Sequence, residues 1–296
     1  MSSTQLADVR SFNRIVTERV GALGDDFLGR KRPLGEARLL WEVARQGADV
    51  RDLRARLGLD SGYLSRLLRA LEQEGLVSVT PSSRDARVRR VELTPRGAAE
   101  WDELESRSEE FAASVLRPLN AGQREALLEA MGTVSRLLTA SAIAVRVESP
   151  RSADARWCLT RYFEELDARF DGGFVLPHPL GVEAERMAPP HGLFVMARLR
   201  DAPVGCGSLR FRGTGPAEIK RMWVSPSVRG LGLGRRLLHE LEGRAREAGA
   251  PATRLETNRS LREAISLYRD AGYREVKPFN DLPYAHHWFE KSLPHD

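Results

Sequence analysis

Cysteine is scarce in this sequence, and long apolar stretches are missing from it. The 296 residues include two cysteines, Cys158 and Cys206, and neither has the spacing of a metal-ligand set, so we expect buried thiols in a reducing compartment and no metal site. No stretch approaches the ~20 apolar residues of a membrane-spanning helix. The first residues, MSSTQLADVR, lack the apolar segment of a secretory signal. These absences predict a cytoplasmic protein with no membrane partner.

A large excess of charge of one sign is also missing. Lysine and arginine total 46 and aspartate and glutamate total 41, which gives a net charge of +5. This balance is compatible with nucleic-acid binding without indicating it. Hydrophobic residues make up 42% and charged residues 29%, as in globular proteins, and the length favours two domains over one.

The first half of the sequence contains two short helical patterns joined by a tight turn. An apolar helical pattern over 50–57 is followed by Gly58, and Asp60 is placed to cap a second helix that ends at Gly75. Leucines form one side of that helix. The other side is polar and basic, with Ser61, Tyr63, Ser65, Arg66 and Arg69. This is the layout of a helix-turn-helix, whose second helix reads DNA.

A basic β-hairpin is predicted directly after this helix. Segments 76–80 and 87–94 have strand character, and the turn-rich segment 81–85 joins them. Thr94 and Pro95 then begin another helix, as N-cap and first residue. A hairpin in this place is a wing, and its arginines are suited to the negative potential of a narrow minor groove.

The segments LGLDSGYLSRLLRALEQEGLV and SSRDARVRRVELTPRG resemble the MarR family of regulators, over about residues 5–145. The resemblance implies a mainly α winged helix-turn-helix domain that binds double-stranded DNA. It also implies a homodimer held by the terminal helices, here 5–22 and about 95–145. We place DNA contacts on Ser61, Tyr63, Ser65 and Arg66 of the second helix and on Arg84 and Arg87 of the wing.

The second half is expected to form an α/β mixed sheet. The pattern gives a strand at 142–148, a helix at 153–169, an irregular loop at 171–191, strands at 192–200, 203–212 and 217–225, a helix at 232–248, a strand at 253–257, a helix at 261–271, and strands near 273–277 and 284–291. This order predicts helices on both faces of the sheet. We set the boundary between the domains at 145/146, which gives domains 1–145 and 146–296.

The main signal of the second half is RGLGLGR at 229–235, between a strand and an amphipathic helix. Free N–H groups at the start of such a helix bind phosphate. A P-loop is excluded because arginines follow the glycines. A dinucleotide fingerprint is excluded because neither register, from Gly230 or Gly232, reaches a third glycine. The remaining pattern, Arg/Gln-x-x-Gly-x-Gly/Ala, fits Arg229, Gly232 and Gly234.

This pattern, within EIKRMWVSPSVRGLGLGRRLLHELEGRAREAG and followed by LETNRSLREAISLYRDAGY, resembles the GNAT superfamily of N-acetyltransferases over about 143–293. The resemblance implies acetyl-CoA as cofactor, with its pyrophosphate on the glycine loop and its pantetheine arm beside the preceding strand. The implied cofactor-binding residues are Met222, Trp223, Val224, Arg229, Gly230, Leu231, Gly232, Leu233, Gly234, Arg235 and Asn258.

Acetyl transfer to an amine needs a base for the amine, a hydrogen-bond donor for the thioester oxygen and an acid for the leaving thiolate. The resemblance assigns the base to Glu218 and the acid to Tyr268. A backbone N–H of the strand before the loop is the expected donor. Two structural interpretations stay open: Glu218 pairs with Lys220 or Arg221, and Tyr268 only packs its ring.

The two halves together predict an acetyl-CoA-dependent N-acetyltransferase for a small amine or amino acid, fused to a MarR-type regulator that binds DNA. One alternative is a regulator that senses acyl-CoA or another ligand and turns over little. Another is a protein-lysine acetyltransferase. The acceptor segments 163–191 and 278–288 do not decide between these functions, because their aromatic and acidic residues suit a compact cationic acceptor and a protein core equally well.

Overall fold

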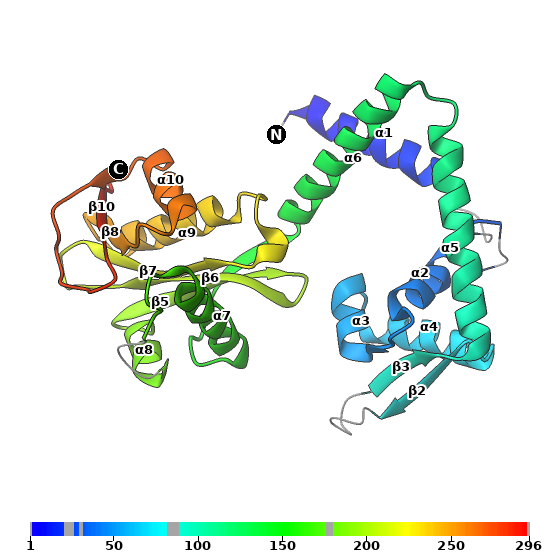
Figure 1. Ribbon diagram of the computed structural model, residues 1–296, viewed down its shortest axis with the longest axis horizontal. Helices are drawn as coiled ribbons and strands as arrows, with labels where there is room; N and C mark the ends of the chain where they lie inside the picture. Colours follow the sequence, from blue (N-terminus) through cyan, green and yellow to red (C-terminus); the bar gives the residue numbers. More distant parts are fainter. Residues whose placement is uncertain (1, 21–26, 30–31, 82–88, 176–179, 295–296) are drawn as a thin grey trace. The chain divides into compact units, whose positions relative to one another are not determined.

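The computed structural model describes residues 2–20, 27–29, 32–81, 89–175 and 180–294. The chain divides into two compact units, Met1–Ala130 and Met131–Asp296 (Figure 1). The predicted boundary at 145/146 stays a prediction and falls within strand β4 (Ile143–Glu148) of the second unit. Within the described ranges, no helix is long and apolar enough to cross a membrane.

The first unit combines helices with a small antiparallel sheet. Its elements are α1 (Ser3–Arg19), α2 (Leu34–Val43), β1 (Ala48–Asp49), α3 (Val50–Leu57), α4 (Ser61–Gln73), β2 (Val77–Pro81), β3 (Arg89–Leu93), α5 (Pro95–Leu116) and α6 (Ala121–Ser141), which continues into the second unit. The sheet order is β1-β3-β2. Leucines of α2 and α4 pack with Val77 and Val91 of the sheet in one core.

The turn between α3 and α4 follows from two residues. Gly58 ends α3 in the left-handed conformation, with φ of 64°, which glycine adopts without steric cost. The Asp60 carboxylate accepts a hydrogen bond from the N–H of Tyr63 at 2.9 Å and so caps α4. The β2–β3 hairpin follows α4, and α5 begins at Pro95 with Thr94 as its cap. The predicted winged helix-turn-helix is confirmed.

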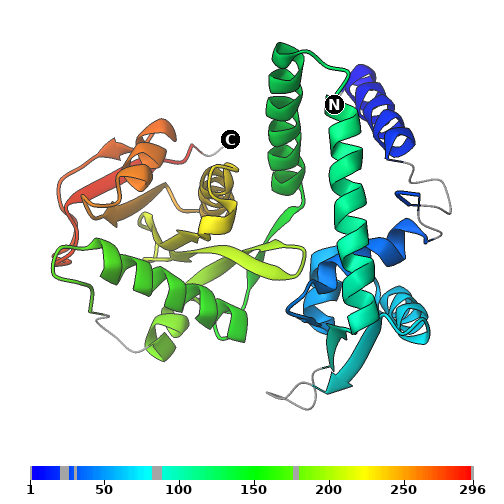
Figure 2. The same cartoon turned by 45° about the vertical axis from the view of Figure 1, so that its right-hand side comes forward.

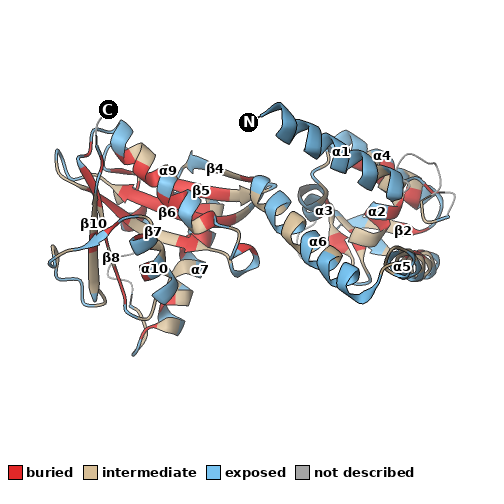
Figure 3. Cartoon of the chain, turned by 90° about the horizontal axis from the view of Figure 1, so that it is seen from above, coloured by how far each residue is buried: buried red, intermediate tan, exposed pale blue. Residues whose placement is uncertain are grey.

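Two helices, α1 and α6, have no buried residue. Both are drawn mostly as exposed (Figure 3). Their exposed large apolar side chains are Leu6, Val9, Phe12, Ile15 and Val16 on α1, and Leu128, Met131, Leu137 and Leu138 on α6. Apolar side chains gathered on exposed helices indicate an interaction surface.

The second unit is a mixed sheet covered by helices. Its elements are β4, α7 (Ala153–Arg169), α8 (Leu180–Arg186), β5 (Gly192–Leu199), β6 (Ala202–Arg210), β7 (Ala217–Val224), a 3-10 turn (Pro226–Val228), α9 (Leu233–Glu247), β8 (Ala252–Thr257), α10 (Arg262–Asp270), β9 (Arg274–Glu275) and β10 (His287–Ser292). The strand order is β4-β5-β6-β7-β8-β10-β9, and only β7 and β8 pair in parallel. The predicted α/β mixed sheet is confirmed.

Helices cover both faces of this sheet (Figure 2). Leu237 and Leu241 of α9 pack with one set of strand residues, including Leu209. Cys158 of α7 packs with the set that faces the other way, including Cys206. The segment 171–191, which was predicted to be an irregular loop, contains helix α8. The sequence pattern could not predict this helix, because its seven residues cover less than two helical periods.

A candidate acyltransferase site between two diverging strands

The site lies where strands β7 and β8 separate. They pair at only two positions, Ala217 with Thr253 and Glu218 with Arg254. Beyond these positions, the edge of β7 that faces β8 has no strand partner in the described sheet. The backbone of 222–224 therefore has hydrogen-bonding groups on this edge that no strand uses, although the carbonyl of Val224 accepts a hydrogen bond from Arg229 at 3.1 Å. This is the place predicted for the pantetheine arm.

A bulge in β7 accompanies this separation. The register between β6 and β7 shifts between Cys206 and Ser208, and Arg221 has φ of +56°, a conformation that side chains with a Cβ rarely adopt. Contacts hold Arg221 in place: its guanidinium donates to Glu183 at 2.5 Å and lies 5.2 Å from the ring centre of Phe163. Bulges redirect strands beside functional sites, and this one bends β7 at the cavity.

The glycine loop forms a cradle at the start of α9. Gly230 and Gly232 have φ of +77° and +75°, and a Cβ built at either would have no atom within 4 Å. Gly232 is the N-cap of α9 and supplies no side-chain hydrogen bond, so the first N–H groups of the helix are available to an anion. Arg229 lies beside them and donates to Glu165 at 2.5 Å. The cradle can therefore hold a phosphate group.

A cavity of about 540 Å³ connects this cradle with the free edge of β7. Nine of the predicted cofactor residues line it: Met222, Trp223, Val224, Arg229, Gly230, Gly232, Leu233, Gly234 and Arg235. The other two lie elsewhere. Leu231 packs against the core. Asn258 donates to the carbonyl oxygen of Tyr284 at 2.8 Å and lines a neighbouring cavity.

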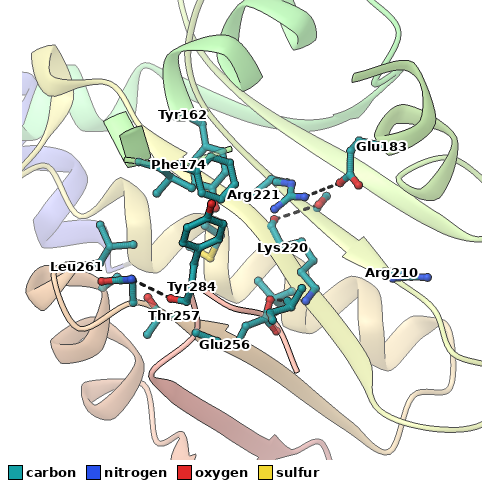
Figure 4. A pocket seen from close by; sticks show the side chains of 18 of the residues that line it. Tyr162, Phe174, Glu183, Arg210, Lys220, Arg221, Glu256, Thr257, Leu261 and Tyr284 are labelled. Carbon is teal, nitrogen blue, oxygen red and sulfur yellow. Dashed lines mark hydrogen bonds and ion pairs between the residues drawn. The ribbon is translucent and has the colours of Figure 1, made fainter. Parts of the chain in front are cut away.

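The neighbouring cavity has a volume of about 270 Å³ and is polar on one side and aromatic on the other (Figure 4). The two cavities share six lining residues: Tyr162, Leu166, Met222, Leu261, Ala264 and Tyr268. Tyr268 is buried, and burial raises the pKa of its hydroxyl well above the usual value. A protonated phenol thus lies where the two cavities meet.

Two parts of the chain match known families. Residues 159–273 match the acetyltransferase (GNAT) family, and residues 28–88 match the MarR family. An IAA acetyltransferase of Azospirillum brasilense is 34% identical over 46% of this chain and 88% of that protein. The chain belongs to the acetyltransferase (GNAT) family.

The chain is similar to further proteins. The N-alpha-acetyltransferase RimI of Mycobacterium tuberculosis is 32% identical over 47% of this chain and 84% of that protein. Among solved structures, a GNAT acetyltransferase of Staphylococcus aureus has a TM-score of 0.45 and 19% identity, covering 52% of this chain and all of that one. Acetyl-CoA is the acyl donor of the GNAT family, and the open glycine cradle beside Arg229 and Arg235 fits a pyrophosphate.

Glu218, the predicted base of this GNAT site, lies outside both cavities. Its side chain is 2% exposed and accepts a hydrogen bond from Arg254 at 2.7 Å, with Arg212 at 3.3 Å. Burial would raise the pKa of Glu218, but the Arg254 hydrogen bond and the charges of Lys220 and Arg212 together lower it. The structure therefore gives Glu218 the geometry of an ion-pair partner. Of the two partners that the sequence left open, Lys220 lies 3.9 Å from Glu218, whereas Arg221 pairs with Glu183.

Two carboxylates, unlike Glu218, line the cavity of about 270 Å³. Glu256 of β8 forms an ion pair with Lys220 and accepts a hydrogen bond from Asn280 at 3.3 Å. Glu183 of α8 is paired with Arg221. The sequence analysis missed both. No local sequence signal distinguishes either residue.

The predicted DNA contacts of the MarR-like unit lie on α4. Ser61, Tyr63 and Arg66 are exposed, Ser65 is half-buried, and the Arg66 guanidinium lies 5.5 Å from the Tyr63 ring centre. These four side chains are free of the leucine core on the opposite side of α4. The predicted wing residues Arg84 and Arg87 lie outside the described residues.

Proposed function

We propose that the second unit transfers an acetyl group from acetyl-CoA to the amine of a small molecule or amino acid. This acceptor enters the 270 Å³ cavity, which is therefore the acceptor cavity. The observation that carries this proposal is the meeting of the two cavities at Tyr268. One cavity contains the glycine cradle, and the other contains ionisable side chains. A donor and an acceptor that enter from the two sides would meet at one point, which is the requirement for direct transfer.

The residues at the junction have complementary roles in this proposal. Bound acetyl-CoA supplies the thioester carbonyl that an amine attacks. Glu256 replaces Glu218 as the proposed base, because its carboxylate lines the acceptor cavity and can take the proton of the amine. Tyr268 holds a proton on its hydroxyl and gives it to the departing sulfur. The backbone of Met222 positions the ligand along the free edge of β7.

The first test is CoA release from acetyl-CoA by the purified chain, across amines, amino acids and a lysine-rich peptide. Turnover with small acceptors supports the proposal. Turnover with the peptide alone favours a protein-lysine acetyltransferase, and tight acetyl-CoA binding without turnover favours a ligand-sensing regulator.

The base assignment has its own test. Glu256→Gln is expected to lower kcat/KM about 100-fold, a typical contribution of a positioned acid or base, while acetyl-CoA binding stays unchanged. Unaltered turnover by this variant would remove Glu256 from the chemistry.

We further propose that the first unit binds double-stranded DNA as a regulator, in the cytoplasm, where DNA and acetyl-CoA are both present. The exposed polar side of α4, with Arg66, supports the DNA contact. Arg66→Ala should weaken binding by about 1–3 kcal/mol if this side chain contacts a base. Equal affinities of the variant and the wild type, measured by fluorescence anisotropy at one salt concentration, would remove Arg66 from the interface.

The proposed regulator is a homodimer held by its terminal helices. The exposed apolar side chains of α1 support this, since Phe12 is 44% and Ile15 62% exposed. The double variant Phe12→Glu and Ile15→Glu is expected to be monomeric by sedimentation equilibrium. A dimer that persists in this variant would exclude α1 from the interface.

A further inference from the structure

The acceptor cavity holds more cations than carboxylates. Its described charged lining residues are Arg186, Arg210, Lys220, Arg221, Glu183 and Glu256. Glu183 pairs with Arg221 at 2.5 Å and lies 3.5 Å from Arg186, and Glu256 pairs with Lys220. Both carboxylates are therefore already matched by cations. One cation of the cavity, Arg210, is left over.

Arg210 is the last residue of β6 and lies opposite Glu218 on β7. The carboxylate of Glu218 is already engaged by Arg254 and Arg212. Within the described part of the chain, the Arg210 side chain has no hydrogen bond or ion pair. Burial and the nearby charge of Arg212 lower the pKa of Arg210. A half-buried, unpaired guanidinium in a cavity is a strong binding group for a carboxylate.

The position of Arg210 sets how far the carboxylate of a bound acceptor would lie from the acceptor's amine. Glu218, its neighbour across the sheet, precedes Met222 at the cavity junction by four residues of β7. Four residues of a regular strand extend roughly 13 Å, and the bulge at Arg221 shortens this span. An acceptor whose amine and carboxylate are several bonds apart fits this span.

One wall of the cavity is suited to an apolar body. Phe170, Phe174 and Tyr284 line it, and the ring centre of Tyr284 lies 4.9 Å from that of Phe174 and 5.8 Å from that of Phe170. In Figure 4, Phe174 and Tyr284 lie to one side and Arg210 to the other, with Lys220 between them. The cavity thus presents an apolar wall and a separate cationic end.

We propose that the acceptor is an amine that carries a carboxylate several bonds away, and that Arg210 binds this carboxylate. The proposal rests on the acetyltransferase function proposed above and deepens it. Arg210 acts as a specificity-determining residue, because it would distinguish such acceptors from neutral amines of the same shape.

The test compares 4-(aminomethyl)benzoate with 4-(aminomethyl)benzamide, which have the same shape and differ in charge. The wild type should show a kcat/KM about 10- to 100-fold higher for the acid, the range expected for a charged hydrogen bond. Arg210→Gln should remove this preference by lowering kcat/KM for the acid, and Arg210→Lys should restore part of the preference. The matched control is Arg246→Gln, because Arg246 is exposed on α9 and lines neither cavity.

Equal rates for acid and amide in the wild type would overturn the inference, and so would an equal loss with both in Arg210→Gln. The same pair of N-acetylated ligands is also compared by calorimetry in the presence of CoA. The N-acetylated acid should bind more tightly than the N-acetylated amide to the wild type, and Arg210→Gln should not distinguish them. If the wild type shows no preference for the acid, or binds neither ligand, the inference is also contradicted. Failure of the proposed function is recognised separately, by the absence of acetyl-CoA binding or of turnover with any amine.

Discussion

Replacing Glu218 by glutamine separates its two possible roles, the predicted catalytic base and the structural ion-pair partner. The substitution keeps the shape of the side chain and removes its charge. Glu218 is 2% exposed, and three cations lie within 4 Å of it: Arg254 at 2.7 Å, Arg212 at 3.3 Å and Lys220 at 3.9 Å. Glutamine would accept one of these hydrogen bonds and leave the cations without a compensating charge.

The expected cost follows from the burial of the partners. Removing one member of a fully buried ion pair costs about 3–5 kcal/mol. The side chains of Arg254 and Lys220 are 21% and 16% exposed, and that of Arg212 is 47% exposed. Because water then solvates the unpaired cations in part, we expect Glu218→Gln to lower the free energy of unfolding by about 2 kcal/mol. For a domain of this size that corresponds to a fall in Tm of roughly 4–8 °C.

The pH dependence gives the sign of the effect. The folded-state pKa of Glu218 is lowered, so its contribution to stability is present above the unfolded value of about 4.3 and is lost as the pH falls through the folded-state value. The difference in Tm between wild type and Glu218→Gln should therefore be full at pH 7 and shrink in acid. Differential scanning calorimetry at a series of pH values measures this directly.

The matched control is Glu247→Gln, whose carboxylate is 68% exposed and pairs with Arg244. It should change stability by less than about 0.5 kcal/mol. The reasoning fails if Glu218→Gln has the Tm of the wild type and instead loses turnover at neutral pH but not at high pH. That result would return the role of base to Glu218.

Two further substitutions test the donor side and the junction. Tyr268→Phe should lower kcat/KM about 100-fold without changing acetyl-CoA affinity. Because burial raises the pKa of Tyr268, the wild type should also lose stability above about pH 10. The variant should lose less stability than the wild type in an alkaline unfolding series. Gly232→Ala, at φ of +75°, should cost about 1–2 kcal/mol and weaken acetyl-CoA binding in calorimetry, whereas the control Gly243→Ala inside α9 should be neutral or stabilising. Wild-type turnover in the first variant, or wild-type affinity in the second, would contradict these roles.

The features that the sequence predicted well are those set by local chemistry. Asp60 caps α4, and Thr94 with Pro95 begins α5, because each cap depends on residues within one helical turn. The glycine loop was recognisable for the same reason: only glycine adopts the backbone conformation of Gly230 and Gly232 at little cost. The two families could be identified from such local segments.

The features that were missed depend on contacts between distant segments. The bulge at Arg221 is stabilised by Glu183, which lies 38 residues away in the chain, and the helix that carries Glu183 is too short to produce a periodic pattern. No local rule places a positive φ on an arginine. The polar side of the acceptor cavity therefore became visible only in the folded chain.

The two carboxylates Glu218 and Glu256 show why spacing along the sequence was not enough to choose the base. Both lie on strands of the same parallel pair, and Glu256 is two residues beyond Arg254, which is the partner of Glu218 across the pair. Side chains two residues apart on a strand share a face, so both carboxylates belong to the same side of the sheet. The strands are still paired at Glu218, where Arg254 covers the carboxylate, but they have separated at Glu256, which lines the cavity. The point at which two strands part decides which carboxylate an acceptor can reach, and that point is a property of the sheet and not of either strand.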